Sequence, residues 1–217
     1  MRRRAYADWE YWGRPVPSFG DPQARVLLLG LAPGAHGSNR TGRPFTGDGS
    51  GEFLFSVLHE AGFASQPHAT SRNDGMELHD LWITAVARCA PPGNKPTTEE
   101  LRNCAPWLDE EIRLLNQMRV VVCLGHIAFE GLLNWALRNC IITVRRGFAF
   151  GHGTEFTFTN GLHVITSYHP SLQNTNTGRL TRPMFLQIFN RARQLAGSPN
   201  FSENEPQLTY ARDEHDL

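Results

Sequence analysis

The sequence predicts a three-layer α/β fold with a short, mainly parallel central sheet. Apolar, branched runs that are typical of buried strands alternate along the chain with segments whose apolar residues recur at helical spacing. Strands that alternate with helices form parallel sheets covered by helices on both faces. Ligands of such sheets bind at the carboxyl ends of the strands. We therefore expect the functional loops at that edge.

The first half of the chain supplies a strand, a helix and a second strand. Residues 24–33 (ARVLLLGLAP) form a continuous apolar run that ends in a glycine and proline loop, which predicts a buried parallel strand. Apolar residues recur at helical spacing over residues 53–58, and Gly62 can end that helix. Residues 81–89 (LWITAVARC) predict the next buried strand. Together these segments form a βαβ unit.

Two more helices and a third buried strand follow. Thr97 and Glu100 stand in capping-box register, which predicts a helix that runs to Leu115. Residues 120–125 (VVVCLG) predict the third strand, and the apolar residues of the segment 127–137 predict the helix behind it.

The alternation then breaks. Four phenylalanines flank the glycine-containing turn at residues 151–153 and predict a β-hairpin: Phe148, Phe150, Phe156 and Phe158. A strand follows in residues 162–170 (LHVITSYHP), and a last helix is expected from about Arg182 to Leu195. We expect one domain over residues 1–197 and a polar C-terminal tail over residues 198–217.

Length and composition limit the class of protein. With 217 residues, of which 40% are hydrophobic, the chain can bury one core but is short for two typical domains. Aromatic and polar residues follow the basic N-terminus in place of an apolar run, so we expect neither a signal peptide nor a membrane span. The prediction is a cytoplasmic protein and a monomer.

Charge and cysteine content add two constraints. The formal net charge is zero, so affinity for nucleic acid must come from charge gathered on one face. Lys95 is the only lysine, which leaves very few amines for Schiff-base chemistry. Four cysteines without a secretory signal favour buried thiols or metal ligation over disulfides.

Two polar loops leave predicted strands at their carboxyl ends and should therefore face one crevice. They span residues 30–48 (GLAPGAHGSNRTGRPFTGD) and 167–181 (SYHPSLQNTNTGRLT). The first is rich in glycine, and the second carries His169 and several amides.

These loops, together with residues 88–97 (RCAPPGNKPT), resemble the type B branch, or fifth family, of the uracil-DNA glycosylases, relatives of the iron-sulfur type A enzymes. The resemblance covers nearly the whole chain, from residue 11 to residue 197. Three long motifs in the same order are far more specific than a short pattern. They imply a monofunctional DNA glycosylase of base excision repair, which hydrolyses the N-glycosidic bond of uracil above all and of other deaminated or modified bases in DNA.

The loops contain residues suited to gripping a base and stabilising its departure. A base within a duplex must be flipped into a pocket and held by an aromatic face. Phe45 is the candidate, and the alternative is that it belongs to the core. Negative charge develops on the departing base, so a donor is needed at the base oxygens. The resemblance assigns this role to His169, for which a purely structural role is the alternative.

A water must also be oriented at the sugar carbon by a carboxylate or an amide. By resemblance this role falls to Asp48 and Asn174. The alternative for Asp48 is an N-cap of the next helix. The alternative for Asn174 is a turn former in a loop rich in asparagine and threonine.

The predicted base pocket also includes Gly30 and Ala32 of the first loop. Type A relatives carry an asparagine shortly before the motif cysteine, and Ala85 takes that place here. Losing a bidentate amide costs about 1 to 3 kcal/mol of discrimination. We therefore expect a pocket broader than uracil requires, with Asn94 as a partial substitute by resemblance.

Arginines, together with backbone amides of the glycine-rich turns, are expected to hold the phosphates. The candidates are Arg40, Arg43, Arg179 and Arg182. Arg2, Arg3 and Arg4 could help, although a solvated end is the favoured alternative. Leu172 is either a wedge that fills the gap left by the flipped base or an apolar anchor of its loop.

Cys89 and Cys104 match the later pair of iron-sulfur ligands in the family. The earlier pair, a CxxC upstream of the tryptophan-rich segment, is not in this sequence. A four-iron cluster needs four ligands. Cys123 is not expected to replace a missing ligand, because it lies within a predicted buried strand. Whether Cys140 could be a ligand stays open. The 4Fe-4S cluster is thus an expectation that the sequence half supports. Either the earlier pair was lost through a late start site, or the protein functions without a cluster.

Two other functions remain as alternatives. A member of the same superfamily could grip uracil-containing DNA, or bond to it through the motif histidine, without turnover; the retained Asp48 and Asn174 argue against this. A nucleotide-binding α/β protein could use the glycine-rich loop for phosphates. No GxxxxGK followed by Ser or Thr comes after the first strand, which disfavours that class.

Overall fold

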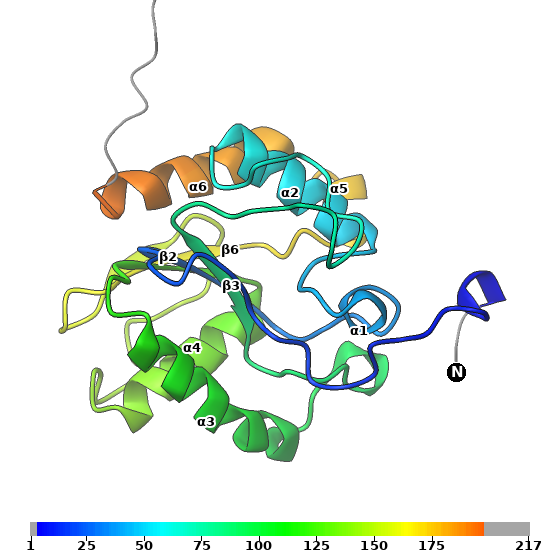
Figure 1. Ribbon diagram of the computed structural model, residues 1–217. Helices are drawn as coiled ribbons and strands as arrows, with labels where there is room; N and C mark the ends of the chain where they lie inside the picture. Colours follow the sequence, from blue (N-terminus) through cyan, green and yellow to red (C-terminus); the bar gives the residue numbers. More distant parts are fainter. Residues whose placement is uncertain (1–3, 198–217) are drawn as a thin grey trace, which may run out of the picture.

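Six strands form one mixed sheet in the computed structural model, which describes residues 4–197, in the order β1-β3-β2-β4-β6-β5 (Figure 1). The four inner strands are parallel to one another: β3 (Leu81–Ala85), β2 (Val26–Gly30), β4 (Val120–Leu124) and β6 (His163–Ser167). The edge strands β1 (Phe19–Gly20) and β5 (Glu155–Thr157) are antiparallel to their neighbours. The predicted mainly parallel sheet is confirmed.

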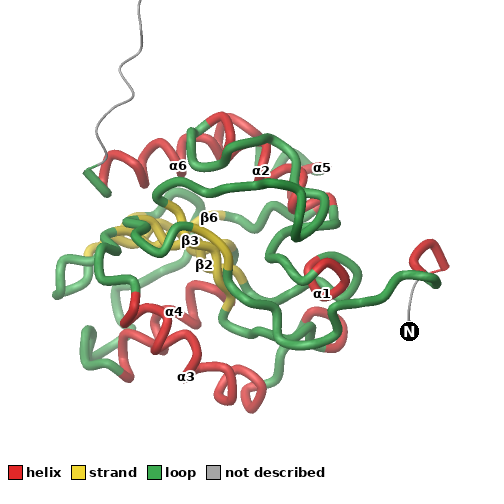
Figure 2. Tube along the Cα trace, in the orientation of Figure 1, coloured by secondary structure: helices red, strands yellow, loops and turns green. Residues whose placement is uncertain are grey.

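Helices cover both faces of this sheet, as Figures 1 and 2 show. One layer contains α2 (Gly49–Glu60) and α6 (Arg182–Leu195), and the other contains α3 (Thr98–Leu114) and α4 (His126–Arg138). Successive residues of a strand point to opposite faces, so Leu28 packs beneath α2 and α6 while Leu27 and Leu29 pack against α4. This burial on both faces explains the continuous apolar runs of the sequence.

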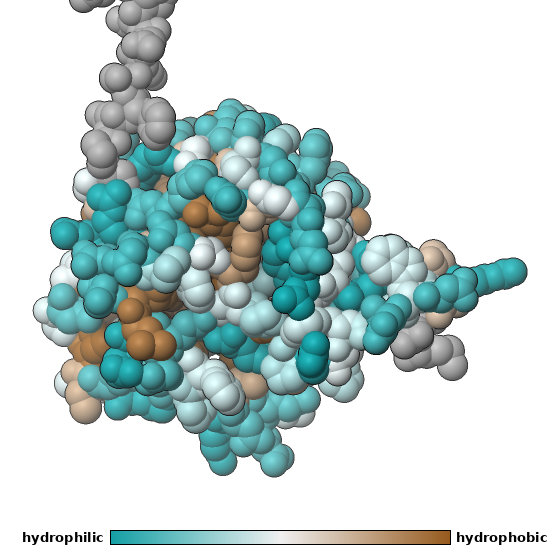
Figure 3. Space-filling view, viewed as in Figure 1, coloured by the Kyte–Doolittle hydropathy of each residue, from teal (hydrophilic) through white to brown (hydrophobic). Residues whose placement is uncertain are grey.

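Apolar side chains are gathered mainly in these two core layers. The face seen in Figure 3 is largely hydrophilic, with hydrophobic surface in separate patches. Within residues 4–197, no helix has both the length and the apolar character needed to cross a membrane.

The predicted βαβ unit is confirmed as β2, α2 and β3. Asp48 caps α2 by accepting a hydrogen bond from the Gly51 amide (3.0 Å), and Gly62 follows the helix with φ +74°. The capping box of α3 is present as well, because Thr97 and Glu100 each accept a hydrogen bond from the other's backbone N–H (3.1 and 2.6 Å).

The predicted hairpin over residues 148–158 is wrong. Only residues 155–157 form a strand there, and this strand pairs with β6 because β6 is the exposed edge of the parallel sheet. Phe148 packs instead on Phe156 (5.3 Å between ring centroids), and Phe156 stacks on Phe129 of α4 (5.6 Å). The four phenylalanines thus mark a core under a loop.

Short elements within loops were not predicted. They are α1 (Ser38–Thr41), α5 (Leu172–Asn176) and the 3₁₀ turns η1 (Arg4–Tyr6) and η2 (Pro92–Asn94). The strand β3 ends at Ala85, four residues before the expected end at residue 89. The predicted tail over residues 198–217, together with Arg2 and Arg3, lies outside the described residues.

Candidate active site

The loops that follow β2 and β6 meet at a cavity of about 300 Å³, so the expectation of a shared crevice is confirmed. The turn that contains Asn94 supplies a third part of its wall. The lining residues are Leu31, Ala32, Gly34, Ser38, Phe45, Asp48, Ser50, Asn94, His169 and Ser171. Three of the predicted functional side chains, Phe45, Asp48 and His169, therefore surround one space.

Phe45 lies between the core and the cavity in an uncommon backbone conformation. Its φ of +51° falls in the left-handed region, which costs a non-glycine residue on the order of 1 kcal/mol or more. A Cβ on Gly30 would lie 3.1 Å from the ring atom Cζ, so the ring packs closely on the end of β2. Its centroid is 5.9 Å from that of the His169 ring, with 31° between the planes. The ring thus has a fixed place beside the histidine.

The first turn of α2 lies against the backbone of Phe45. A Cβ on Gly51 would come within 1.7 Å of the Phe45 carbonyl oxygen, so only glycine fits at this position. The start of the helix and the turn that presents the aromatic ring therefore form one packed unit.

A buried ion pair holds the loop from the other side. Arg43 donates two hydrogen bonds to the carboxylate of Asp74 (2.7 and 2.6 Å) and one to Thr46 Oγ1 (3.0 Å). Burial raises the pKa of Asp74, but the hydrogen bonds from Arg43 and from backbone amides, including those of Thr70 and Met76, outweigh it and bring the pKa well below its usual value. Asp74 is thus ionised and paired at neutral pH.

His169 is largely enclosed by the two loops. Burial lowers its pKa below the usual value, while the negative charge of Asp48 acts in the opposite direction. The neutral imidazole has one N–H, which can donate a hydrogen bond to an acceptor in the cavity.

Asn174 does not line the cavity. Its side-chain amide donates a hydrogen bond to the backbone carbonyl of His169 (2.8 Å). This N–H group therefore holds the backbone of the histidine, and the expectation that Asn174 orients the water stays a prediction. Asn174 itself lies in the short helix α5.

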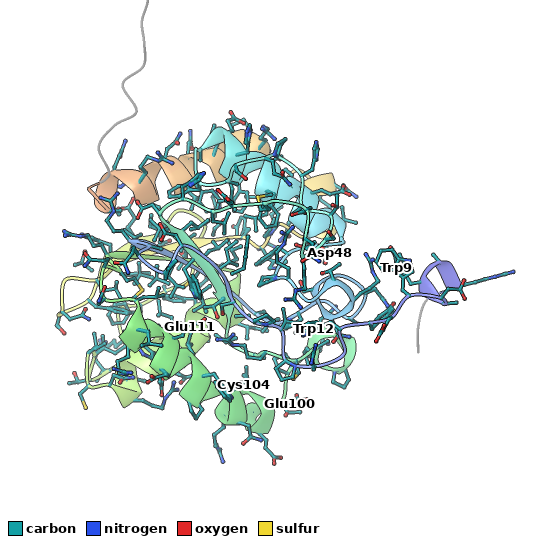
Figure 4. The ribbon with its side chains drawn as sticks, in the orientation of Figure 1. Trp9, Trp12, Asp48, Glu100, Cys104 and Glu111 are labelled. Carbon is teal, nitrogen blue, oxygen red and sulfur yellow. The ribbon has the colours of Figure 1, made fainter. Side chains whose placement is uncertain are left out.

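The two carboxylate oxygens of Asp48 have different surroundings. Oδ1 accepts the cap hydrogen bond from Gly51, so the N-cap alternative is confirmed. Oδ2 faces the glycine loop, where a Cβ on Gly37 would lie 2.2 Å from it. One residue can therefore cap a helix with one oxygen and present the other to the site. Figure 4 shows Asp48 at the junction between α2 and the α1 loop.

The remaining predicted base-pocket residues divide between two spaces. Ala32 and Asn94 line the main cavity. Gly30 and Ala85 line a small recess that shares Ala32 and Phe45 with the main cavity. Asn94 ends the 3₁₀ turn η2 with φ +57°, in the left-handed region.

A polar network lies beside this recess and was missed from the sequence. Ser18 donates to Thr84 (2.8 Å), Thr84 donates to Glu111 of α3 (2.6 Å), and Arg88 pairs with the same carboxylate (2.6 Å). These residues come from distant segments and form no motif. Ser171, by contrast, could have been found, because it follows His169 by two positions and caps a helix.

The structure does not leave Arg40 and Arg43 free to bind phosphate. Both are buried, with exposed fractions of 7% and 3%. Arg40 donates hydrogen bonds to the carbonyls of His36 and Gly47 (2.9 and 3.0 Å), and Arg43 is committed to Asp74. These two expectations are corrected, because the guanidinium groups stabilise the loop from within.

The other candidates for DNA contact lie on the surface. Arg182 pairs with Glu60 and thereby joins α6 to α2. Arg179 is exposed and lies over the ring of Tyr168 (4.4 Å to the centroid). Leu172 is 56% exposed, yet it also contacts the loop, since a Cβ on Gly49 would lie 2.7 Å from it. Both alternatives for Leu172 therefore remain compatible with its position.

The four cysteines do not lie together as the ligands of a four-iron cluster would. Cys89 is exposed and Cys104 is half-buried on α3 (Figure 4). Burial raises the pKa of Cys89, and the charges of Cys104 and Glu100 raise it further. Cys123 is fully buried in β4, where burial raises its pKa strongly. Among residues 4–197, no cluster of three or more His, Cys, Asp or Glu side chains could hold a metal ion.

A larger cavity of about 500 Å³ lies at the amino ends of β4 and β6, where Arg119 and His163 line it. Ligands of parallel α/β sheets bind at the carboxyl ends of the strands. The smaller cavity, where the three predicted side chains meet, is therefore the better candidate site.

The chain matches known proteins over most of its length. The model of the uracil DNA glycosylase superfamily matches residues 17–193. A type-5 uracil-DNA glycosylase of Thermus thermophilus is 54% identical over 90% of this chain and 87% of its own length. The type-5 enzyme of Mycobacterium bovis is 47% identical over 91% of this chain and 72% of its own. A type-4 enzyme of Sulfurisphaera tokodaii is 28% identical over 88% and 79% of the two chains.

Proposed function

The chain belongs to the uracil-DNA glycosylase superfamily, and on this premise we propose that it hydrolyses the N-glycosidic bond of uracil in DNA as a repair enzyme of the type 5 branch. The observation that carries the proposal is the meeting of Phe45, Asp48 and His169 in one cavity at the carboxyl ends of the parallel strands. The sequence similarity to enzymes named for this activity supports it.

Each of the three side chains has one part in the reaction. The extruded base stacks on Phe45, whose ring is fixed by Gly30 and by its backbone. His169 donates its N–H to the carbonyl oxygen where negative charge develops as the bond breaks. A neutral donor suits this step, and burial keeps His169 neutral. Asp48 Oδ2 orients a water toward the sugar carbon, where positive charge develops.

The base pocket admits more than uracil. Ala85 stands where an asparagine would recognise the pyrimidine edge, so the wall at this position has no side-chain amide that selects for uracil. Asn94 is the amide within the cavity lining that remains to contact the base. We expect hydroxymethyluracil and deaminated purines to be released as well, although more slowly than uracil.

Surface side chains of the second loop and of the start of α6 contact the DNA. Arg179 supplies a cation at the end of the second loop, and Leu172 inserts where the flipped nucleotide was. The pair of Arg182 with Glu60 is exposed and weak, so it can open in favour of a phosphate.

The experiment is a base-release assay on an oligonucleotide with one uracil, using the wild type, His169→Ala and Asp48→Asn. The wild type should leave an abasic site in an intact strand, because the only lysine does not line the cavity. Each variant should lose on the order of a hundredfold or more in rate. Covalent trapping of the DNA by borohydride would contradict simple hydrolysis. A persistent complex without abasic product would favour the binding protein that does not turn over.

A further inference from the structure

A second cavity of about 360 Å³ adjoins the candidate active site. It shares Gly34, Asp48 and Asn94 with the first cavity, so the two spaces lie on either side of these residues. Its outer wall comes from Tyr6 of the N-terminal segment, and Leu172 closes it on another side. In Figure 4 the segment that carries Trp9 leaves the body of the molecule next to the α1 loop, to which backbone hydrogen bonds of Trp12 and Gly13 attach it.

The N-terminal segment is fixed in place by a buried cation. The guanidinium of Arg40 lies over the ring of Tyr6 (4.3 Å to the centroid) and over that of Trp9 (4.2 Å). Such contacts are attractive and strengthen when the cation is desolvated. A second attachment joins the Tyr11 hydroxyl to His36 Nδ1 (3.0 Å). Tyr6 is thus held against the first loop as part of the cavity wall.

Arg40 forms no ion pair among the described residues. Both of its assigned hydrogen bonds go to backbone carbonyls, and within residues 4–197 none of the ion pairs involves this guanidinium. Gly47, which also lines the cavity, lies directly on it, since a Cβ there would be 2.6 Å from Arg40 Nη2. The wall therefore combines the aromatic ring of Tyr6 and the carboxylate of Asp48, with the guanidinium of Arg40 behind Gly47.

We propose that this second cavity binds the nucleotide adjacent to the extruded one, with its base against Tyr6. This inference rests on the proposed function. A strand whose base occupies the first cavity can reach the second only through the next nucleotide. An aromatic face accepts any base by stacking. The N-terminal segment is therefore a part of the substrate site.

A double comparison of protein and substrate tests the proposal. The substrates are a single-stranded oligonucleotide with one uracil and two derivatives, each of which replaces one neighbouring nucleotide, 5′ or 3′, by a base-free tetrahydrofuran unit. The proteins are the full-length wild type, Tyr6→Ala and Tyr6→Phe. Trp107→Ala, which removes an exposed ring on α3 outside both cavity linings, is the control.

Loss of one neighbouring base should lower kcat/KM of the wild type and of Tyr6→Phe by about tenfold, the scale of one base-aromatic stack. Removal of the same base should lower kcat/KM of Tyr6→Ala by less than about twofold, because this variant already lacks the ring on which the base stacks. On the unmodified oligonucleotide, Tyr6→Ala should raise KM and leave kcat nearly unchanged. The Trp107→Ala protein should behave as the wild type.

The proposal is overturned if removal of the 5′ base and removal of the 3′ base each lower kcat/KM of Tyr6→Ala by the same factor as kcat/KM of the wild type. Release of uracil by the wild type is measured in the same assay and tests the proposed function separately. Should the wild type release none, dissociation constants for the same three oligonucleotides still test the cavity. Their dependence on Tyr6 would support it, and equal constants for wild type and Tyr6→Ala would reject it.

Discussion

Asp48 shows how one side chain can serve both the fold and the chemistry. Its Oδ1 caps α2, and its Oδ2 faces the glycine loop of the cavity. The two roles can be separated by substitution, because asparagine is as good an N-cap as aspartate but carries no charge.

We expect Asp48→Asn to keep the stability of the wild type within about 0.5 kcal/mol while losing on the order of a hundredfold in uracil release. Asp48→Ala should lose a similar factor in rate and in addition about 1 kcal/mol of stability, because the cap is gone. Single-turnover rates and urea unfolding measure the two effects. An active Asp48→Asn protein would remove the carboxylate from the mechanism.

Two half-buried or enclosed histidines should make stability depend on pH. Burial lowers the pKa of His169 and of His152 below the usual 6.5, while the Met184 carbonyl acts in the opposite direction on His152. In the unfolded chain both imidazoles take up a proton near their usual pKa. Between that value and the lower folded values the unfolded state binds more protons, so stability falls as the pH drops.

The free energy of unfolding should therefore decrease from pH 7.5 to pH 5.5, and it should decrease less in His152→Gln/His169→Gln than in the wild type. Urea unfolding at the two pH values gives both differences. Parallel pH dependence in the two proteins would show that these imidazoles are protonated equally in the folded and unfolded chains.

At the scale of elements, the loop that presents Phe45 depends on a buried ion pair. Arg43 and Asp74 have side-chain exposures of only 4% and 9%, and their pairing joins residues 70–76 to the first loop. Removing one member of a buried pair leaves the other charge uncompensated, which costs about 3 to 5 kcal/mol.

Arg43→Ala should therefore be destabilised by about 3 kcal/mol or more, and the salt dependence of its DNA binding should match that of the wild type. Arg113→Ala is the matched control, because its ion pair with Glu110 is exposed and is worth less than about 1 kcal/mol. Unfolding by urea and binding at several salt concentrations provide the measurements. A stable Arg43→Ala protein with a shallower salt dependence would restore Arg43 as a phosphate ligand.

The regular elements could be predicted where a local pattern determines them. The buried strands, the capping box at Thr97 and the helix of residues 182–195 follow from apolar periodicity and cap chemistry. The hairpin could not be excluded, because alternating phenylalanines fit a strand as well as a core under a loop. Pairing of residues 155–157 with β6 depends on the free edge of a sheet, which only the tertiary structure defines.

At the scale of the molecule, the sequence predicts which side chains line the site, but not which groups pack around the loops that carry them. Phe45, Asp48 and His169 meet as expected because they follow parallel strands. The burial of Arg40 and Arg43 could not be foreseen, since their partners are backbone carbonyls and a distant aspartate. Tyr6 was missed as well, because its contact with the first loop crosses about thirty residues without a motif.

The cysteines allow a prediction about the whole protein. Two neighbouring thiols, Cys89 and Cys104, cannot supply the four ligands of a 4Fe-4S cluster. Protein made from these 217 residues should lack bound iron and inorganic sulfide, and Cys89→Ser/Cys104→Ser should release uracil at the wild-type rate. Metal analysis, visible absorbance and the base-release assay check this. Stoichiometric iron and sulfide that survive chelation would contradict it.

The close approach of Gly51 to the Phe45 carbonyl, and of Gly37 to Asp48, affects how mutational maps of this enzyme should be interpreted. In a saturation scan scored by survival or repair, both glycines would rank beside the residues that perform the chemistry, although neither has a side chain to contribute. Sensitivity at these positions would report lack of space and not a reactive group. A ranking by tolerance alone would thus overcount the catalytic residues.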